Sequence, residues 1–241
     1  MNTAIVLAGG SGRRMNSDIP KQYMMLKGKP VIYYSLKAFQ DNLHIDDIIL
    51  VTSDHYIEYV KKNILGDTLD KVSKVIQGGV ERYDSVWEGL KCIKESGYVF
   101  IHDGARPCIS QKLINDCYEA VVEDGACIAA VPVKDTIKIA DSEGYAAKTP
   151  DRNTLWQIQT PQCFVTAEIR EAYQKMMEAG DDSVTDDGMV METYGIRGVR
   201  MIKGSYENMK ITTPEDMLLG EAILKGRSTA VSYTHLTLPT T

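Results

Sequence analysis

The sequence predicts an α/β fold with a mostly parallel sheet, helices on both of its faces and a protruding β-hairpin arm. Short apolar runs rich in β-branched residues alternate with helical patterns, which indicates parallel strands joined by helical crossovers. The first run leads directly into a glycine-rich loop, as in open sheets that bind ligands beyond their strand ends. One segment with polar–apolar alternation interrupts the pattern, and its central Asp-Ser-Glu-Gly turn is typical of a hairpin.

Strands and helices are expected in turn along most of the chain. Strands are predicted at residues 3–7, 47–52, 74–76, 98–102, 127–132 and 199–202. Helices are predicted at residues 31–40, 56–65, 85–94 and 111–122, where apolar residues recur with a helical period. The expected result is a Rossmann-like sheet. No internal repeat or linker-like change of composition divides it, so residues 1–227 are expected to form a single domain.

The predicted arm spans residues 134–153. Its alternating polar and apolar residues surround the turn at residues 141–144. The segment has too few large apolar residues to build a core of its own. It is therefore expected either to lie on the domain or to reach a second subunit.

A further helix is expected near the end of the chain. Thr213 can cap it, Pro214 suits its first position, and two acidic residues follow in the first turn. Four apolar side chains are expected to pack inward from this helix: Leu218, Leu219, Ala222 and Ile223. Residues 228–241 are rich in hydroxyl groups and have no acidic residue. They are expected to be a non-native or disordered tail.

Composition restricts the partners of this chain. The net charge of −6 argues against nucleic acid, whose binding proteins are usually basic. No run approaches the roughly 18 apolar residues of a membrane span, and no signal peptide is evident. The five cysteines show no CxxC pairing, which indicates thiols in a reducing cytoplasm.

The glycine loop indicates a triphosphate site. It lacks the third glycine of a dinucleotide-binding fingerprint, and it contains no P-loop lysine motif. What remains is Gly10-x-Gly12-x-Arg14, followed by Pro20 and Lys21. Glycines allow backbone amides to approach a ligand closely, and Arg14 and Lys21 supply charge for phosphates. A nucleoside triphosphate is therefore the expected ligand.

Other polar stretches follow predicted strands. Asp103 ends the strand at 98–102 and could hold Mg²⁺ together with substrate phosphates. Arg106 could reach an acidic group of a second substrate, whereas His102 is expected to pack or to form hydrogen bonds. Gly79 and the helix start near Ser85 could accept a base edge or a phosphate, although Ser85 also suits a plain helix start. Candidates for a small anionic substrate are Thr136, Arg152, Thr160 and Lys210, each of which could equally be an ordinary surface residue.

With these stretches placed, the sequence from about residue 3 to residue 225 closely resembles the 2-C-methyl-D-erythritol 4-phosphate cytidylyltransferase family. The motifs that carry the resemblance, in chain order, are LAGGSGRRM, PKQY, GGVERYDSV, HDGARP, PVKDTIK, DRNTLWQIQTPQCF and NMKITTPEDM. Two positions depart from the family pattern, because Val80 stands where a polar residue is commoner and Gly104 where an alanine is commoner. The resemblance implies a fold of the nucleotide-diphospho-sugar transferase type. It also implies transfer of CMP from CTP to methylerythritol phosphate, a need for Mg²⁺, and a homodimer in which the arm of one subunit closes the site of the other.

The resemblance also assigns residues. The catalytic set would be Arg14, Lys21, Arg152 and Lys210. The CTP-binding set would be Ala8, Gly9, Gly10, Gly12, Gly79, Arg82, Ser85 and Asp103, with Asp103 also the metal ligand. The substrate-binding set would be Arg106, Thr136, Arg152, Thr160 and Lys210.

Two other functions stay open at this point. One is a ribitol 5-phosphate cytidylyltransferase, which resembles this chain in the first loop and in the TPQ segment. We expect such enzymes to lack the DRNxLW segment found here at 151–156, which favours methylerythritol phosphate. The other is a non-catalytic sugar-nucleotide binding module, against which Arg14, Lys21 and Asp103 argue. If the chain is a cytidylyltransferase, a phosphate oxygen of the substrate attacks the α-phosphorus of CTP in line. This oxygen is already anionic, so no general base is required.

Overall fold

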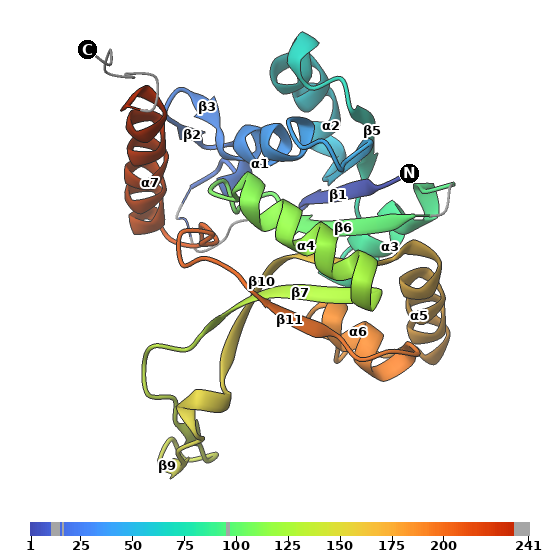
Figure 1. The fold of residues 1–241 in the computed structure, drawn as a ribbon, viewed down its shortest axis with the longest axis vertical. Coiled ribbons are helices and arrows are strands. Elements are labelled where there is room, and N and C mark those ends of the chain that lie inside the picture. Colours follow the sequence, from blue (N-terminus) through green and yellow to red (C-terminus); the bar gives the residue numbers. More distant parts are fainter. Residues whose placement is uncertain (11–14, 16, 95–96, 234–241) are drawn as a thin grey trace, which may run out of the picture.

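The computed structural model describes residues 1–10, 15, 17–94 and 97–233, and its centre is a seven-stranded sheet in the order β11-β7-β10-β6-β1-β4-β5 (Figure 1). Six strands are mutually parallel, and β10 runs antiparallel to its neighbours β6 and β7. The strands are β1 Thr3–Ala8, β4 Asp47–Thr52, β5 Val72–Gln77, β6 Tyr98–Asp103, β7 Ala126–Pro132, β10 Trp156–Val165 and β11 Arg200–Lys203. The predicted mostly parallel sheet is confirmed.

Helices cover both faces of the sheet. On one face α1 (Val31–Gln40), α2 (Asp54–Val60) and α4 (Gln111–Asp124) enclose one apolar core. On the other face α3 (Arg82–Cys92), α5 (Thr166–Ala179) and α6 (Asp187–Tyr194) enclose a second core. Successive side chains of a strand point to opposite faces, so in β1 Ala4 and Val6 enter the first core and Ile5 enters the second. Because both faces of the strands are buried, their sequences are continuous apolar runs.

Three of the larger elements were not predicted from the sequence. Strand β10 was missed because Gln159, Pro161 and Gln162 are atypical of a central strand, and its register with β7 shifts between Ile158 and Gln162. Helix α6 is short, with 8 residues, and its buried face includes the non-apolar Asp187 and Gly188. Helix α5 carried a readable signal, because its buried residues Ile169, Ala172, Tyr173 and Met176 follow the helical period.

Smaller elements complete the fold. After β1 come η2 (Lys21–Tyr23) and the short pair β2 (Met25–Leu26) and β3 (Lys29–Pro30). Helix α2 continues as a π-helical turn, η3 (Lys61–Leu65), and a 3₁₀ turn, η4 (Gly66–Thr68). Of the helices that the structure describes, none is both long and apolar enough to cross a membrane.

The predicted hairpin is present as β8 (Ile139–Ala140) and β9 (Ala146–Lys148), followed by the 3₁₀ turn η5 (Arg152–Thr154). It extends well away from the sheet and its helices (Figure 1). Nearly every residue from 134 to 149 is exposed. Of the two expected arrangements, the structure therefore excludes the one in which the segment lies on its own domain.

Helix α7 (Pro214–Tyr233) begins at the predicted residue, and Asp216 accepts hydrogen bonds from the backbone of Thr212 and Thr213 at 2.7 and 2.9 Å. The predicted inward face was wrong, because Leu218 and Leu219 are 73% and 53% exposed. The helix instead packs through Met217 and Leu224 against a small third apolar cluster. Gly220 lies on that same face, facing Ile211 and Leu26. The helix also runs past the expected domain boundary at residue 227.

Candidate active site

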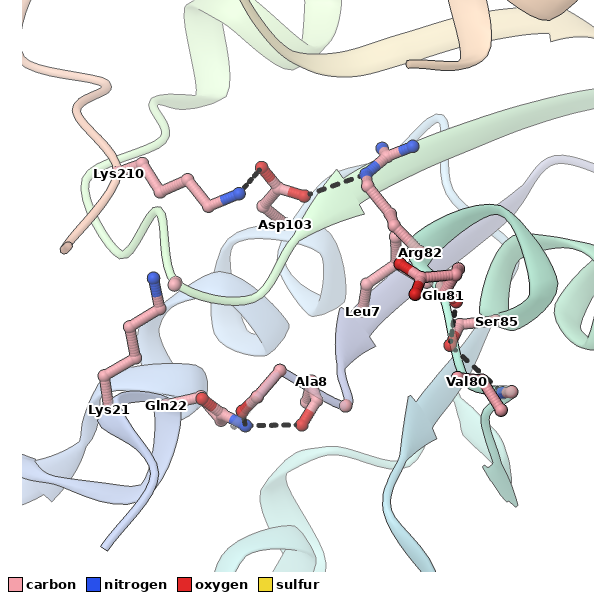
Figure 2. A pocket seen from close by; sticks show the side chains of 14 residues that line it. Leu7, Ala8, Lys21, Gln22, Val80, Glu81, Arg82, Ser85, Asp103 and Lys210 are labelled. Carbon is pink, nitrogen blue, oxygen red and sulfur yellow. Dashed lines mark hydrogen bonds and ion pairs between the residues drawn. The ribbon is translucent and has the colours of Figure 1, made fainter. Parts of the chain in front are cut away.

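A cavity of about 460 Å³ opens at the carboxyl ends of β1 and β6, beside the N-terminus of α3 (Figure 2). Its lining residues are Leu7, Ala8, Gly9, Gly10, Lys21, Gln22, Gly79, Val80, Glu81, Arg82, Ser85, Asp103, Ala105 and Lys210. This edge is where open α/β sheets bind their ligands. The parallel strands thus bring together segments that lie far apart in the sequence.

Gln22 fixes the start of the glycine loop. Its side-chain amide donates to the carbonyl oxygens of Ala8 at 2.6 Å and Gly10 at 2.8 Å. The next residue, Tyr23, shares a buried hydrogen bond between its hydroxyl and that of Thr52 at the end of β4. These contacts anchor η2 beside the end of β1. The side chain of Lys21 extends from this turn into the cavity (Figure 2). Sequence reasoning missed Gln22 as a structural support, although it lies within the PKQY motif.

Asp103 is the electrostatic centre of the cavity. One carboxylate oxygen, Oδ2, lies 3.0 Å from Nζ of Lys210 and 3.5 Å from Nε of Arg106. The other, Oδ1, lies 3.5 Å from Nε of Arg82. Burial by itself would raise the pKa of Asp103, but these three cations outweigh it and hold the pKa well below its ordinary range. Asp103 is therefore a carboxylate at every physiological pH.

A buried hydrogen-bonded chain sets the position of Asp103. The Asp103 backbone N–H donates to Oγ1 of Thr160 at 3.0 Å, and this hydroxyl lies 3.0 Å from Nδ1 of His102. The other ring nitrogen of His102 lies 3.4 Å from the Arg106 carbonyl oxygen. Burial lowers the pKa of His102 to about 3, so the ring is neutral. His102 thus packs and forms hydrogen bonds, as expected, and does not serve as a proton acceptor in the cavity.

Arg82 is held by a partner that the sequence did not reveal. Its guanidinium forms two hydrogen bonds with the carboxylate of Asp187, at 2.8 and 2.7 Å. Asp187 is fully buried at the start of α6 and also accepts from the Tyr173 hydroxyl at 2.6 Å. Burial would lower the pKa of Arg82, but the charge and hydrogen bonds of Asp187, together with the charge of Asp103, outweigh it and raise the pKa. Arg82 stays charged, with its Nε directed at Asp103.

In the loop before α3, the position of Gly79 has no room for a side chain. A Cβ atom at Gly79 would lie 2.1 Å from Cβ of Asp84. Asp84 itself accepts from the Glu81 backbone N–H at 2.9 Å as one half of a capping box. The Gly79 backbone N–H donates to the Ser85 hydroxyl at 3.2 Å. Gly79 is therefore required by packing as well as by any approach of a ligand.

Lys210 depends on the irregular part of β10. Asn208, two residues earlier, donates through its side-chain amide to the Thr160 carbonyl oxygen at 2.8 Å and to Gln159 at 3.3 Å. Arg106 in turn donates to the Asn208 carbonyl oxygen at 2.9 Å. The same short stretch of β10 thus supports both Asp103 and the segment that presents Lys210.

The structure separates the sequence-predicted site residues into groups. It brings together at the cavity Ala8, Gly9, Gly10, Lys21, Gly79, Arg82, Ser85, Asp103 and Lys210. Arg106 and Thr160 are buried behind Asp103 and are not among the lining residues. Thr136 and Arg152 lie exposed on the arm, where Arg152 donates to the Lys134 carbonyl oxygen at 3.1 Å. Gly12 and Arg14 lie outside the described residues.

The donor set at the cavity fits a magnesium ion that takes most of its ligands from phosphates. Asp103 and Glu81 are the acidic residues among the lining residues that the structure describes. Mg²⁺ is usually bound by one or two carboxylates with substrate phosphates and water. Oδ1 of Asp103 has one cationic neighbour, at 3.5 Å, whereas Oδ2 has two. Oδ1 is therefore the better candidate ligand.

This doubly covered, mostly parallel sheet, with a cavity lined by cations at its carboxyl edge, matches the fold of nucleotidyltransferases. The chain belongs to the 2-C-methyl-D-erythritol 4-phosphate cytidylyltransferase family, whose model matches residues 2–226. It is similar to the curated family member of Lachnospira eligens, with 61% identity over 94% of this chain and 100% of that protein. The member from Clostridium novyi is 47% identical over 95% of this chain and 98% of its own.

Solved structures agree with this assignment. The 4-diphosphocytidyl-2C-methyl-D-erythritol synthase of Anaerococcus prevotii superimposes with a TM-score of 0.80 at 34% identity, covering 93% of this chain and 96% of its own. The 2-C-methyl-D-erythritol 4-phosphate cytidylyltransferase of Francisella tularensis gives a TM-score of 0.78 at 32% identity, covering 92% and 99%. The family resemblance predicted from the motifs is confirmed.

Proposed function

We propose that this chain transfers CMP from CTP to 2-C-methyl-D-erythritol 4-phosphate. The products are 4-(cytidine 5'-diphospho)-2-C-methyl-D-erythritol and pyrophosphate, in the non-mevalonate isoprenoid pathway. Membership of the family supports this activity. The single structural observation that carries it is the cavity lined by Lys21 and Lys210, in which Lys210 lies 3.0 Å from the carboxylate of Asp103.

The reaction requires two anions to approach each other. A phosphate oxygen of methylerythritol phosphate attacks the α-phosphorus of CTP, that new P–O bond forms, and the bond to pyrophosphate breaks. The attacking oxygen is already anionic, so a neutral His102 behind the cavity is no obstacle. Catalysis then consists of positioning and charge neutralisation by fixed cations. We assign this role to Lys21 and Lys210, and to Arg14 in the loop outside the described residues.

We propose Mg²⁺ as the cofactor, held by Asp103 together with CTP phosphates. A bound Mg²⁺ ion would neutralise charge on the triphosphate oxygens as pyrophosphate departs. Within the protein, Arg82 keeps Asp103 oriented toward the cavity from the side opposite Lys210 (Figure 2). Chelation should abolish turnover, and Asp103→Asn should raise the Mg²⁺ concentration required for half-maximal rate.

Two residues assigned to the second substrate lie away from the cavity of their own chain. Among the described residues, Thr136 and Arg152 are remote from it on the exposed arm. We propose a homodimer in which residues 134–153 of one subunit reach the cavity of the other. Arg152 would there meet the phosphate of methylerythritol phosphate, next to Lys210. Arg106 and Thr160 would contribute by holding the floor of that pocket.

A cytoplasmic location follows from the same proposal. CTP is made and used in the cytoplasm, and the five cysteines are all unpaired thiols. Fractionation of cells that express the full chain should recover pyrophosphate-releasing activity in the cytoplasmic fraction.

One assay tests the proposed function against its alternatives. Pyrophosphate release is measured with each of the four nucleoside triphosphates, against methylerythritol phosphate and against ribitol 5-phosphate. Release with CTP and methylerythritol phosphate alone supports the proposal. Faster release with ribitol 5-phosphate than with methylerythritol phosphate would identify ribitol 5-phosphate as the second substrate. No release with any pair, from protein that still binds CTP, would favour a binding module.

A further inference from the structure

Three buried cysteines from separate elements meet in the core between α4 and the sheet. Cys117 lies on α4, Cys127 on β7 and Cys163 on β10, and their sulfur atoms all lie within 4.8 Å of one another. Cys127 and Cys163 face each other directly across the antiparallel β7–β10 pair. All three side chains are fully buried. The catalytic reaction uses none of them.

The cluster has the donors of a site for a thiophilic ion. It contains three thiols and, among the described residues, no histidine or carboxylate joins it. Thiolates are soft ligands, which excludes Mg²⁺ and Ca²⁺ as occupants. All three cysteines belong to the apolar core that α1 and α4 cover, so a net charge left there would be costly.

Charge balance selects the occupant. Three thiolates around a divalent ion leave one net negative charge in the apolar core. Three thiolates around trivalent arsenic leave none. We propose that Cys117, Cys127 and Cys163 form a three-thiol site that binds trivalent arsenic, supplied as arsenite.

The binding step balances without an oxidant. Arsenous acid, As(OH)₃, reacts with three thiols to give an arsenic tris-thiolate and three water molecules. Three As–O bonds break, three As–S bonds form, and each thiol proton leaves with a hydroxide. Arsenous acid is small and uncharged at neutral pH, so it can reach the core through local opening of α4 from the sheet.

The test uses the full chain, reduced and treated with sodium arsenite. Intact-mass measurement should find one arsenic atom gained in exchange for three protons. After denaturation in an alkylating reagent, three of the five thiols should be protected, and peptide mapping should place them at Cys117, Cys127 and Cys163. No adduct, an arsenic that retains a hydroxyl group on two thiols, or protection of other cysteines would each overturn the proposal.

Variants localise the site. Cys127→Ala and, separately, Cys117→Ala should lose the three-proton adduct. Cys108→Ala is the matched control because Cys108 is equally buried but lies outside the cluster, and it should keep the adduct. Retention by Cys127→Ala, or loss in Cys108→Ala, would contradict the assignment. A parallel titration with Cd²⁺ tests the charge argument, since tight binding of Cd²⁺ without binding of arsenite would refute it. If a variant does not fold, the peptide map of the unaltered chain still decides.

Discussion

At the scale of single residues, the cavity is organised around cations that are fixed before any substrate arrives. Asp103 lies within 3.5 Å of Lys210, Arg106 and Arg82. The pKa of its carboxyl is far below the usual range, so Asp103 stays a carboxylate at neutral pH. Cations held in place by such pairs need little reorganisation when charge develops on a leaving group.

Lys21 provides the most direct test of charge neutralisation. It lines the cavity from η2, and the neighbouring Gln22 anchors that turn to the carbonyl oxygens of Ala8 and Gly10. Lys21→Ala should reduce kcat by about 10²–10³-fold, as for the loss of a single transition-state donor, while the fold survives. Pyrophosphate release and circular dichroism measure the two effects. Lys175→Ala, at an exposed position on α5, is the control, and near-normal turnover in Lys21→Ala would remove Lys21 from the catalytic set.

His102 makes stability depend on pH. Burial lowers its pKa from the ordinary 6.5 to about 3, so the folded state favours the neutral ring. Its contribution is fully present above pH 6.5 and is lost as the pH falls from 6.5 toward 3. Over that window the free energy of unfolding should drop by up to about 1.4 kcal/mol per pH unit through this group. Urea unfolding of His102→Gln should show a shallower decline, and an unchanged slope would contradict the neutral buried histidine.

At the scale of elements, β10 connects the parts of the site. Thr160 accepts from the backbone of Asp103, and its own carbonyl oxygen accepts from Asn208 in the segment that carries Lys210. Gln162 accepts from the Gly188 backbone N–H at 2.8 Å and thereby holds the start of α6. The polar residues of β10 therefore join β6, α6 and the Lys210 segment, and Gln162 is also one of those that make the strand hard to predict.

Asp187 at the start of α6 should act through Arg82. In Asp187→Asn an amide N–H₂ group would face the Arg82 guanidinium, so one of the two hydrogen bonds is lost and Asp103 is left as the charged partner of Arg82. We expect a loss of about 3 kcal/mol of stability, and a raised KM for CTP in protein that remains folded. A variant that only loosened the core would melt earlier yet keep its KM. Recovery of KM in Asp187→Glu would support the positioning role, and an unaltered KM in Asp187→Asn would oppose it.

At the scale of the whole molecule, the exposed arm is the feature that a single chain does not explain. Residues 134–149 extend from the body and bury almost nothing (Figure 1). The arm carries Thr136 and Arg152, whereas Lys21 and Lys210 line the cavity. An arm that completes the site of a second subunit would place these two groups together.

Mixing two inactive variants tests this arrangement. Arg152→Ala and Lys21→Ala should each have little activity alone. If the arm acts on the partner, a mixed dimer contains one cavity with its own Lys21 and the partner's intact arm. Half of the randomly reassembled dimers are mixed, so roughly a quarter of normal activity should return. No recovery after subunit exchange, verified by mass measurement of mixed dimers, would mean that the arm does not act across a dimer.

Much of the fold followed from local sequence patterns. Local sequence signals mark six of the seven strands, four of the helices and the start of α7. These signals are apolar residues with a regular period, or capping residues, that lie within a few positions of one another. The cavity residues likewise cluster in short motifs that follow strands, so the edge of the sheet on which they meet could be predicted. The face that α7 buries could not, because Leu218 and Met217 are equally apolar and only the position of the third apolar cluster selects between them.

The sequence by itself determined the fold class, the family and the stretches that form the cavity, because these depend on periodicity and on local motifs. Only the tertiary structure decided which side chains meet. The Arg82–Asp187 pair joins residues 105 positions apart, and the burial of Arg106 and Thr160 behind Asp103 depends on how β10 packs against β6. Such contacts have no local signature, since they arise when the helices and strands close around a common core.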